Sequence, residues 1–131
     1  MPQLRISEAA AHLGVSADTL RRWIDRGTLT AHHDDSGRLC VDGHEVALAA
    51  RAHYAPVAPA EGHRSSARNR MVGLVTQITR DTVMAQVEIQ CGPHRIVSLM
   101  SSESVDDLGL EPGSVAVATI KSTNVIVEVE Q

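Results

Sequence analysis

The sequence contains few aromatic residues: among 131 residues it has no phenylalanine, one tryptophan and one tyrosine. Proteins that bind single-stranded nucleic acid commonly stack bases on aromatic side chains, so this scarcity argues against that class. The net charge is −4 at neutral pH. An acidic protein does not bind nucleic acid by bulk electrostatic attraction alone, so any such binding would need a dedicated domain.

Cysteine is also rare, and long apolar runs are absent. Cys40 and Cys91 lie far apart without a metal-binding spacing, which argues against a disulfide framework and favours a reducing cytoplasm. No apolar run approaches the roughly 20 residues that span a bilayer. Glu8, His12 and Asp18 interrupt any signal-peptide pattern at the start. The sequence therefore predicts a cytoplasmic protein without a membrane segment.

Lysine occurs once, as Lys121, whereas all other permanently charged basic residues are arginines. Lys121 lies in the run Ile120-Lys121-Ser122-Thr123. A second run far earlier in the chain, Ser66-Ala67-Arg68-Asn69, also combines a cation with a hydroxyl. An ammonium is a compact charge with three rotatable donors, which suits a small oxyanion. The two runs predict a binding site for a small tetrahedral anion.

We expect two domains, residues 1–54 and 65–131, joined by a linker at 55–64. The linker region is rich in Pro, Gly and Ala and has no hydrophobic period. Before it the apolar residues recur with helical spacing, and after it they alternate as in β-strands. Charge does not distinguish the halves, because each carries six basic and eight acidic residues.

The first half predicts two short helices joined by a glycine-containing turn, which is a helix-turn-helix. Ser7 is expected to cap the first helix and Gly14 to end it. Ser16 or Asp18 is expected to cap the second helix, which stops at Gly27. The apolar face of this second helix comprises Leu20, Trp23 and Ile24, and its exposed face comprises Arg21, Arg22 and Arg26.

Residues 29–41 predict a β-wing, because short extended runs flank the turn sequence Asp34-Asp35-Ser36-Gly37. A third helix is expected to start at Asp42 or Gly43. Its inward residues would be Val46, Leu48 and Ala49.

This order resembles the winged helix-turn-helix of MerR-type and excisionase-type DNA-binding domains over about residues 3–54. The matching segments are Ile6-Ser7-Glu8-Ala9-Ala10, Leu13-Gly14-Val15-Ser16, Thr19-Leu20-Arg21-Arg22-Trp23 and Gly27-Thr28-Leu29. The resemblance implies that the second helix enters the major groove of double-stranded DNA while the wing contacts the phosphate backbone. The implied DNA-binding residues are Thr19, Arg21, Arg22 and Arg38.

One feature departs from that family, whose wings are usually basic. Here the wing reads His32-His33-Asp34-Asp35, which weakens the expected phosphate contacts. A metal cluster formed by His32, His33, Cys40 and His44 is an alternative interpretation. Their spacing fits no standard zinc pattern, so we expect wing and turn residues and no metal.

From Met71 onward the pattern is β, and residues 101–108 predict one short helix that Gly109 ends. About five strands are expected, the last two at residues 115–120 and 125–129. Such an order in so short a segment suggests an OB-like five-stranded β-barrel. The fold class is therefore α+β with two domains.

This half resembles the Mop domain, the molybdate-binding module of the TOBE superfamily. The matching elements are Ser66-Ala67-Arg68-Asn69, Gly73, Ser104, Leu108-Gly109-Leu110, Pro112-Gly113-Ser114 and Ile120-Lys121-Ser122-Thr123. The resemblance implies that molybdate, or tungstate, is bound as a ligand between the subunits of a homo-oligomer. The implied oxyanion-binding residues are Ser66, Arg68, Ser101, Ser104, Lys121 and Ser122.

Structural roles remain open for several of these residues. Ser101 and Ser104 could cap the short helix, Arg68 could form a surface ion pair, and Lys121 could be an ordinary exposed residue. Asn69 is expected to serve the entry into a strand and not to bind the ligand.

No pairing of nucleophile and base and no phosphate-binding glycine loop is present in the sequence, which predicts a non-enzyme. The function expected is a molybdate-responsive DNA-binding transcriptional regulator. Two alternatives stay open. One is a molybdate storage or homeostasis protein whose helix-turn-helix makes protein contacts, and the other is a DNA-organising protein that uses the Mop fold only to oligomerise.

Overall fold

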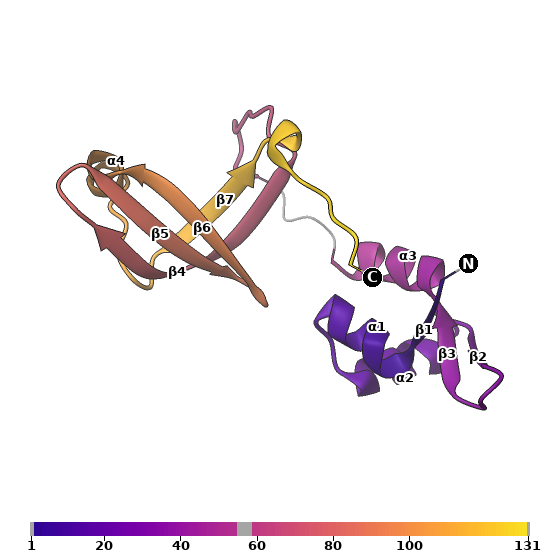
Figure 1. Ribbon diagram of the computed structural model, residues 1–131. Coiled ribbons are helices and arrows are strands. Elements are labelled where there is room, and N and C mark those ends of the chain that lie inside the picture. The colour runs from indigo at the N-terminus through magenta and orange to yellow at the C-terminus, as the bar shows by residue number, and fades with distance from the viewer. Residues whose placement is uncertain (1, 55–58, 131) are drawn as a thin grey trace. The chain divides into compact units, whose positions relative to one another are not determined.

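The computed structural model describes residues 2–54 and 59–130 of the chain. It divides into two compact units, Met1–Ala60 and Glu61–Gln131, each with its own hydrophobic core (Figure 1). The expected linker at 55–64 includes this division, and its residues 55–58 lie outside the described residues. No helix in the described part of the chain is long and apolar enough to cross a membrane.

The N-terminal unit is a small helical domain with a three-stranded antiparallel sheet. Its strands pair in the order β1-β3-β2. In chain order the elements are β1 (Gln3–Arg5), α1 (Ile6–Leu13), α2 (Ala17–Asp25), β2 (Ala31–His33), β3 (Leu39–Asp42) and α3 (Gly43–His53).

Local signals set most of the helix ends in this unit. The Ser16 hydroxyl accepts a hydrogen bond from the Thr19 backbone N–H at 3.1 Å and so caps α2. Asp42 caps α3, because its carboxylate accepts from the N–H groups of His44 and Glu45. Gly14 ends α1 in the left-handed conformation, with φ +69°.

Ser7 does not cap α1, and that prediction was wrong. The helix already begins at Ile6, because β1 pairs with β3 and leads directly into it. The cap position is Arg5, whose backbone N–H donates to the Glu8 carboxylate at 3.0 Å. The acid therefore satisfies a backbone donor at the helix entry, and Ser7 falls inside the first turn.

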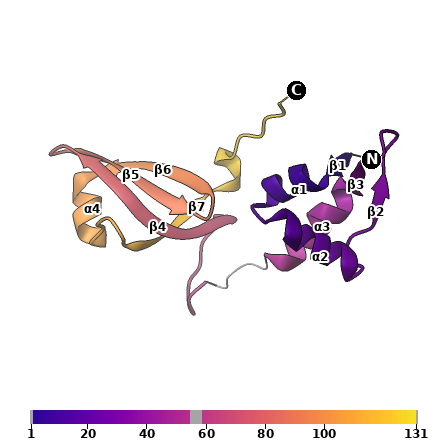
Figure 2. The same ribbon diagram turned by 90° about the horizontal axis from the view of Figure 1, so that it is seen from below.

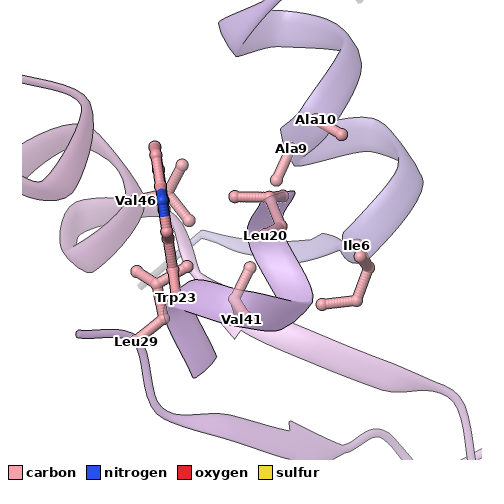
Figure 3. Packing of buried hydrophobic residues seen from close by; sticks show 8 residues of the cluster. All are labelled: Ile6, Ala9, Ala10, Leu20, Trp23, Leu29, Val41 and Val46. Atoms are coloured by element: carbon pink, nitrogen blue, oxygen red, sulfur yellow. The ribbon is translucent and has the colours of Figure 1, made fainter. Parts of the chain in front are cut away.

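The core of this unit is formed by the helices and β3. Leu20 and Val41 are fully buried, and Trp23 lies against them with 8 % of its surface exposed (Figure 3). Val46 brings α3 onto the same cluster, as expected. Leu48 was also expected to point inward, but it is 53 % exposed, so α3 contacts the core through a narrower stripe than its sequence suggests.

The predicted wing is present as the hairpin β2–β3. The Asp34 carboxylate accepts hydrogen bonds from the N–H groups of Ser36 and Arg38 at 2.8 and 2.9 Å. Gly37 has φ +78°, a left-handed conformation that glycine adopts readily and other residues rarely adopt. The turn is therefore fixed by its own sequence.

The C-terminal unit is a curled antiparallel sheet with one helix. Its strands pair in the order β6-β5-β4-β7, so β6 and β7 form the two edges (Figure 2). In chain order the elements are β4 (Asn69–Arg80), β5 (Met84–Cys91), β6 (His94–Ser101), α4 (Ser102–Leu108), β7 (Val115–Ile120) and the 3-10 turn η1 (Ser122–Asn124).

Strand β4 is the central element of this sheet because it pairs with β5 over one part and with β7 over the other. A register shift between Val75 and Gln77 marks a bulge, which bends the strand. At Gly73 the backbone of β4 runs very close to β5. A Cβ atom placed there would lie 2.4 Å from the Gln90 carbonyl oxygen and 2.7 Å from the Cys91 sulfur.

Helix α4 is held at the Arg80 end of β4. The Arg80 guanidinium donates to both carboxylate oxygens of Asp106 and to the Ser102 carbonyl oxygen. This ion pair holds the pKa of the Asp106 carboxyl below its ordinary value. Ser102 itself is buried, and its hydroxyl lies 2.6 Å from the Asp81 carbonyl oxygen.

The expected OB-like architecture is confirmed, with one difference. Residues 125–129 were expected to form a fifth strand, but they form no strand within the described chain. Ile126, Val127 and Val129 are 84–85 % exposed. The reason is that η1 leads this segment away from β7, so no edge of the same sheet pairs with it (Figures 1 and 2).

Candidate functional site

The two runs that predict the anion site meet at one end of the β4–β7 ladder. Asn69 is the first residue of β4 and pairs with Ile120, the last residue of β7. The Asn69 side-chain amide also donates to the Ile120 carbonyl oxygen at 3.0 Å. This pairing places Arg68 and Lys121, the residues next outward on each strand, at the same end of the sheet.

Both cations of this pair are exposed and available for a ligand. Arg68 donates one hydrogen bond, to the Ser65 carbonyl oxygen at 3.1 Å. Lys121 occupies the cap position of η1, whose first residue is Ser122. Among the described residues, the side-chain ion pairs involve other arginines, and neither Arg68 nor Lys121 contacts a carboxylate. The structure therefore shows no surface ion pair for Arg68.

Ser101 and Ser104 lie at the opposite end of the sheet. The Ser101 hydroxyl accepts from the Ser104 N–H at 3.1 Å, and the two hydroxyls are 2.8 Å apart. These contacts make Ser101 the cap of α4. Because Arg80 reaches the neighbouring Ser102 from the far end of β4, the serine pair is at the Arg80 end and not at the Asn69 end.

The two groups of predicted ligand residues are therefore separated by the length of β4. That strand has 12 residues, which at about 3.3 Å per residue corresponds to on the order of 35 Å along the strand. Figures 1 and 2 both place α4 and the turn after β7 at opposite ends of the sheet. In a single chain, Ser66 and Arg68 precede Asn69 closely in sequence, and Lys121 and Ser122 follow Ile120, so these four adjoin the paired strand ends, whereas Ser101 and Ser104 do not.

Arg70 is a further cation at this end that the sequence interpretation did not select. It pairs with Thr119, one position along the ladder from Asn69 and Ile120. Its Nε atom is buried, and within the described residues no acceptor lies in hydrogen-bond range of it. The sequence contains a signal for it, because Arg70 lies only two residues after Arg68, at the start of the same strand.

Three of the four predicted DNA-binding residues lie on α2: Thr19, Arg21 and Arg22. Thr19 and Arg22 line a concavity of about 370 Å³, together with Trp23, Arg26 and His53. Arg21 is exposed next to it and forms an i,i+3 ion pair with Asp18 at 3.2 Å. Arg26 was expected only as an exposed residue, and the structure places it in the same concavity as Thr19 and Arg22.

The wing carries Arg38 as expected, but its charge is mixed. Hydrogen bonds from the backbone, the largest from the Arg38 N–H, lower the pKa of the Asp34 carboxyl, so Asp34 is ionised at neutral pH. Asp35 is exposed and makes no side-chain hydrogen bond that the structure records. The tip of the wing therefore presents two negative charges beside one arginine.

The alternative metal cluster in the wing is not supported by the geometry. Cys40 is buried, and its thiol donates to Asp34 at 3.8 Å. Burial raises the pKa of this thiol, which disfavours the thiolate that binds metals. In residues 2–54 and 59–130 no group of three or more His, Cys, Asp or Glu side chains comes together in a way that could hold a metal ion.

Each of the two units matches a known protein family. Residues 65–127 match the TOBE domain, and residues 4–48 match a helix-turn-helix domain. The chain belongs to the TOBE-domain family and carries a helix-turn-helix in front of its TOBE domain.

The relatives most informative about this family are molybdenum-pterin-binding proteins. Molybdenum-pterin-binding protein 3 of Clostridium pasteurianum is 36 % identical over 63 residues, which are 47 % of this chain and 93 % of that protein. A probable molybdenum-pterin-binding protein of Haemophilus influenzae is 42 % identical over 66 residues, 50 % of this chain and 96 % of that protein. Each match therefore spans about half of this chain and nearly the whole of the relative.

Among solved structures, the chain is similar to a molybdate-binding protein from Sporomusa ovata. The two are 31 % identical, and the match covers 51 % of this chain and 100 % of that one with a TM-score of 0.49.

Proposed function

We propose that this chain is a molybdate-responsive DNA-binding regulator, in which the TOBE domain binds the oxyanion and the helix-turn-helix binds an operator. The observation that carries the first half is the Asn69–Ile120 pairing, because it places Arg68 and Lys121 together at one end of the sheet. The similarity to molybdenum-pterin-binding proteins over the same residues supports the choice of ligand.

The chemistry of the Asn69 end suits a tetrahedral dianion. All four oxygens of molybdate accept hydrogen bonds, so a site needs positive charge and donors without a nearby carboxylate. Arg68 and Lys121 would supply the charge, and the hydroxyls of Ser66 and Ser122 would supply further donors. The unpartnered Nε of Arg70 supports the presence of an acceptor near this end in the ligand-bound protein.

The serines at the Arg80 end would enter such a site only from another copy of the chain. Ser101 and Ser104 lie too far from Arg68 to contact the same anion within one subunit. The site proposed is therefore shared between subunits of a homo-oligomer. An anion held by two chains binds only the associated state, so ligand binding and assembly would be coupled.

The test of this function compares DNA binding with and without ligand. We expect the full chain to bind a duplex from its own upstream region sequence-selectively in a gel-shift assay. Molybdate should change the apparent Kd several-fold, whereas an equal concentration of sulfate should not. If molybdate binds in calorimetry but leaves DNA binding unchanged, the sensing part of the proposal is wrong. If the chain shows no sequence-selective DNA binding at low salt, the proposed regulatory function is wrong.

The acidic wing offers a direct prediction about DNA affinity. Asp35→Lys should tighten DNA binding several-fold and steepen its salt dependence by about one to two released ions, because it replaces a repelled carboxylate with a phosphate-binding ammonium. Binding isotherms at several salt concentrations measure both quantities. Glu61→Lys makes the same charge change outside the helix-turn-helix and should have a smaller effect. Equal effects from both variants would mean that the wing does not contact DNA.

A second function is favoured by one observation, the two neighbouring aspartates, Asp34 and Asp35, in the turn of the wing. It is storage or buffering of molybdate, with the helix-turn-helix making protein contacts. The two functions differ in the gel shift, because a storage protein would bind molybdate and show no operator selectivity.

A further inference from the structure

The concavity of about 370 Å³ in the N-terminal unit is lined by α2 and by the end of α3. From α2 it receives Thr19, Arg22 and Arg26, which follow one another at intervals of three and four residues and therefore share one face of the helix. His53, the last residue of α3, also lines it. The concavity thus combines a hydroxyl, two guanidinium groups and an imidazole, all of which can donate hydrogen bonds to a phosphate.

No carboxylate of the described chain lines this concavity. Its two further lining residues, Val15 from the turn after α1 and Trp23 from α2, are apolar. The ion pairs among the described residues involve neither Arg22 nor Arg26. The charged groups that share the concavity with His53 are therefore both positive. Like charges around one hollow repel each other until an anion lies between them, so the concavity is suited to an anionic group.

Two aromatic contacts hold the ring of His53 in place. Its centroid lies 5.1 Å from the Trp23 ring and 4.6 Å from the Tyr54 ring, with interplanar angles of 57° and 81° respectively. The Tyr54 hydroxyl donates to the Leu13 carbonyl oxygen at 3.1 Å, which ties the end of α3 to α1. His53 itself is exposed, so its imidazole can exchange protons with solvent. The ring is therefore held beside the two arginines and stays free to titrate.

We propose that this concavity binds a phosphate group of the DNA backbone and that His53 is its pH-dependent donor. The inference rests on the proposed function, which places α2 on DNA. Histidine is the side chain that gains or loses its charge between about pH 5 and 8. Protonated His53 adds a third positive charge beside Arg22 and Arg26, and neutral His53 does not. The affinity for DNA therefore falls as the pH rises, and by linkage bound DNA makes His53 hold its proton more tightly.

The test measures the Kd of the full chain for two duplexes, without molybdate. One duplex comes from the chain's own upstream region and the other has an arbitrary sequence. Both carry backbone phosphates, so this contact does not require operator selectivity. We expect the wild-type Kd for either duplex to rise about 10-fold between about pH 6 and pH 8. The salt dependence of binding should fall by about one released ion over the same range.

Three variants separate an effect of charge from an effect on structure. His53→Gln keeps a hydrogen-bond donor without a charge and should reduce the pH effect to less than about 3-fold, the remainder coming from other histidines such as His32 and His33 of the wing. His53→Lys is permanently charged and should bind at about pH 8 as the wild type does at about pH 6. The matched control His44→Gln removes a histidine near the start of α3, outside the concavity, and should keep the full pH effect.

The fluorescence of Trp23 reports on the same proton. Trp23 is the one tryptophan of the chain, and its ring contacts that of His53. A protonated imidazole beside an indole changes the emission of the indole. The emission of the wild type should therefore follow the protonation of His53, and His53→Gln should lose this transition. A saturating concentration of duplex should move the midpoint of the transition to higher pH.

The outcomes distinguish this inference from the proposed function. The inference is overturned if His53→Gln keeps the wild-type pH effect, if His53→Lys does not restore binding at about pH 8, or if duplex leaves the Trp23 midpoint unchanged. A pH effect that depends on His53 but is equal for both duplexes, with equal affinities, would support the inference and contradict operator recognition. If neither duplex binds at low salt, both are wrong.

Discussion

Replacing Arg68 and Lys121 together by alanine is expected to weaken molybdate binding at least roughly 100-fold. Each residue would contribute a charge-assisted hydrogen bond to the anion, and Arg70 would be the one cation that the variant keeps at this end of the described sheet. The Asn69–Ile120 pairing that positions them uses backbone and amide groups, so the variant should keep its fold. Isothermal titration calorimetry with molybdate measures the loss, and circular dichroism checks the fold.

The control for this prediction removes the same charge elsewhere. Arg51→Ala combined with Arg95→Ala lowers the net charge equally, but Arg51 belongs to α3 of the N-terminal unit and Arg95 to β6, a strand that does not pair with β4 or β7. We expect this control to change molybdate affinity less than about 3-fold, by general electrostatics alone. A double variant of Arg68 and Lys121 that binds as tightly as the wild type would show that the site lies elsewhere.

The second large effect concerns stability. Gly73→Ala should destabilise the C-terminal unit by about 3 kcal/mol, because its Cβ would lie 2.4 Å from a backbone carbonyl oxygen that cannot rotate away. For a unit of this size, such a loss lowers the melting temperature by roughly 10–20 °C. Differential scanning calorimetry of the full chain measures the shift.

The division into two units provides an internal reference for that experiment. Val72→Ala, at the exposed neighbour of Gly73 on β4, should shift the same transition by only a few degrees. If the units unfold independently, the transition of the N-terminal unit should stay in place in both variants and serve as an internal reference. Leu20→Ala should have the converse effect and lower the melting temperature of the N-terminal unit only, because Leu20 is fully buried in the core of that unit. Equal shifts of both transitions would contradict independent domains.

The features that could be predicted from the sequence are those set by neighbouring residues. The cap of α2 depends on Ser16 and Thr19, and the wing turn depends on hydrogen bonds that the Asp34 carboxylate accepts from the N–H groups two and four positions on. Ser7 was a plausible cap by the same reasoning. It failed because the start of α1 is decided by β1, whose partner β3 lies far away in the sequence.

The arrangement of the candidate site could not be predicted for the same reason, because it depends on residues far apart in the sequence. The resemblance to the Mop domain implied six oxyanion-binding residues, but spacing along the chain does not say which end of a sheet each will occupy. That depends on strand register, which pairs Asn69 with Ile120 and brings Arg80 to Ser102. The expected fifth strand is a related case: the alternation of residues 125–129 is visible in the sequence, but none of the described strands pairs with that segment.

The position of Asn69 has a mechanical consequence. The chain enters the sheet at this residue, so tension transmitted from the N-terminal side is applied to β4 at its pairing with Ile120. Strands loaded at one end separate one hydrogen-bonded pair at a time, beginning with the loaded pair. An anion that bridges Arg68 and Lys121 would connect the two strands just outside the Asn69–Ile120 pair, so the force would act on this bridge first. We therefore expect molybdate to raise the force needed to separate β4 from β7, and tension on the N-terminal unit to loosen the site from the same end.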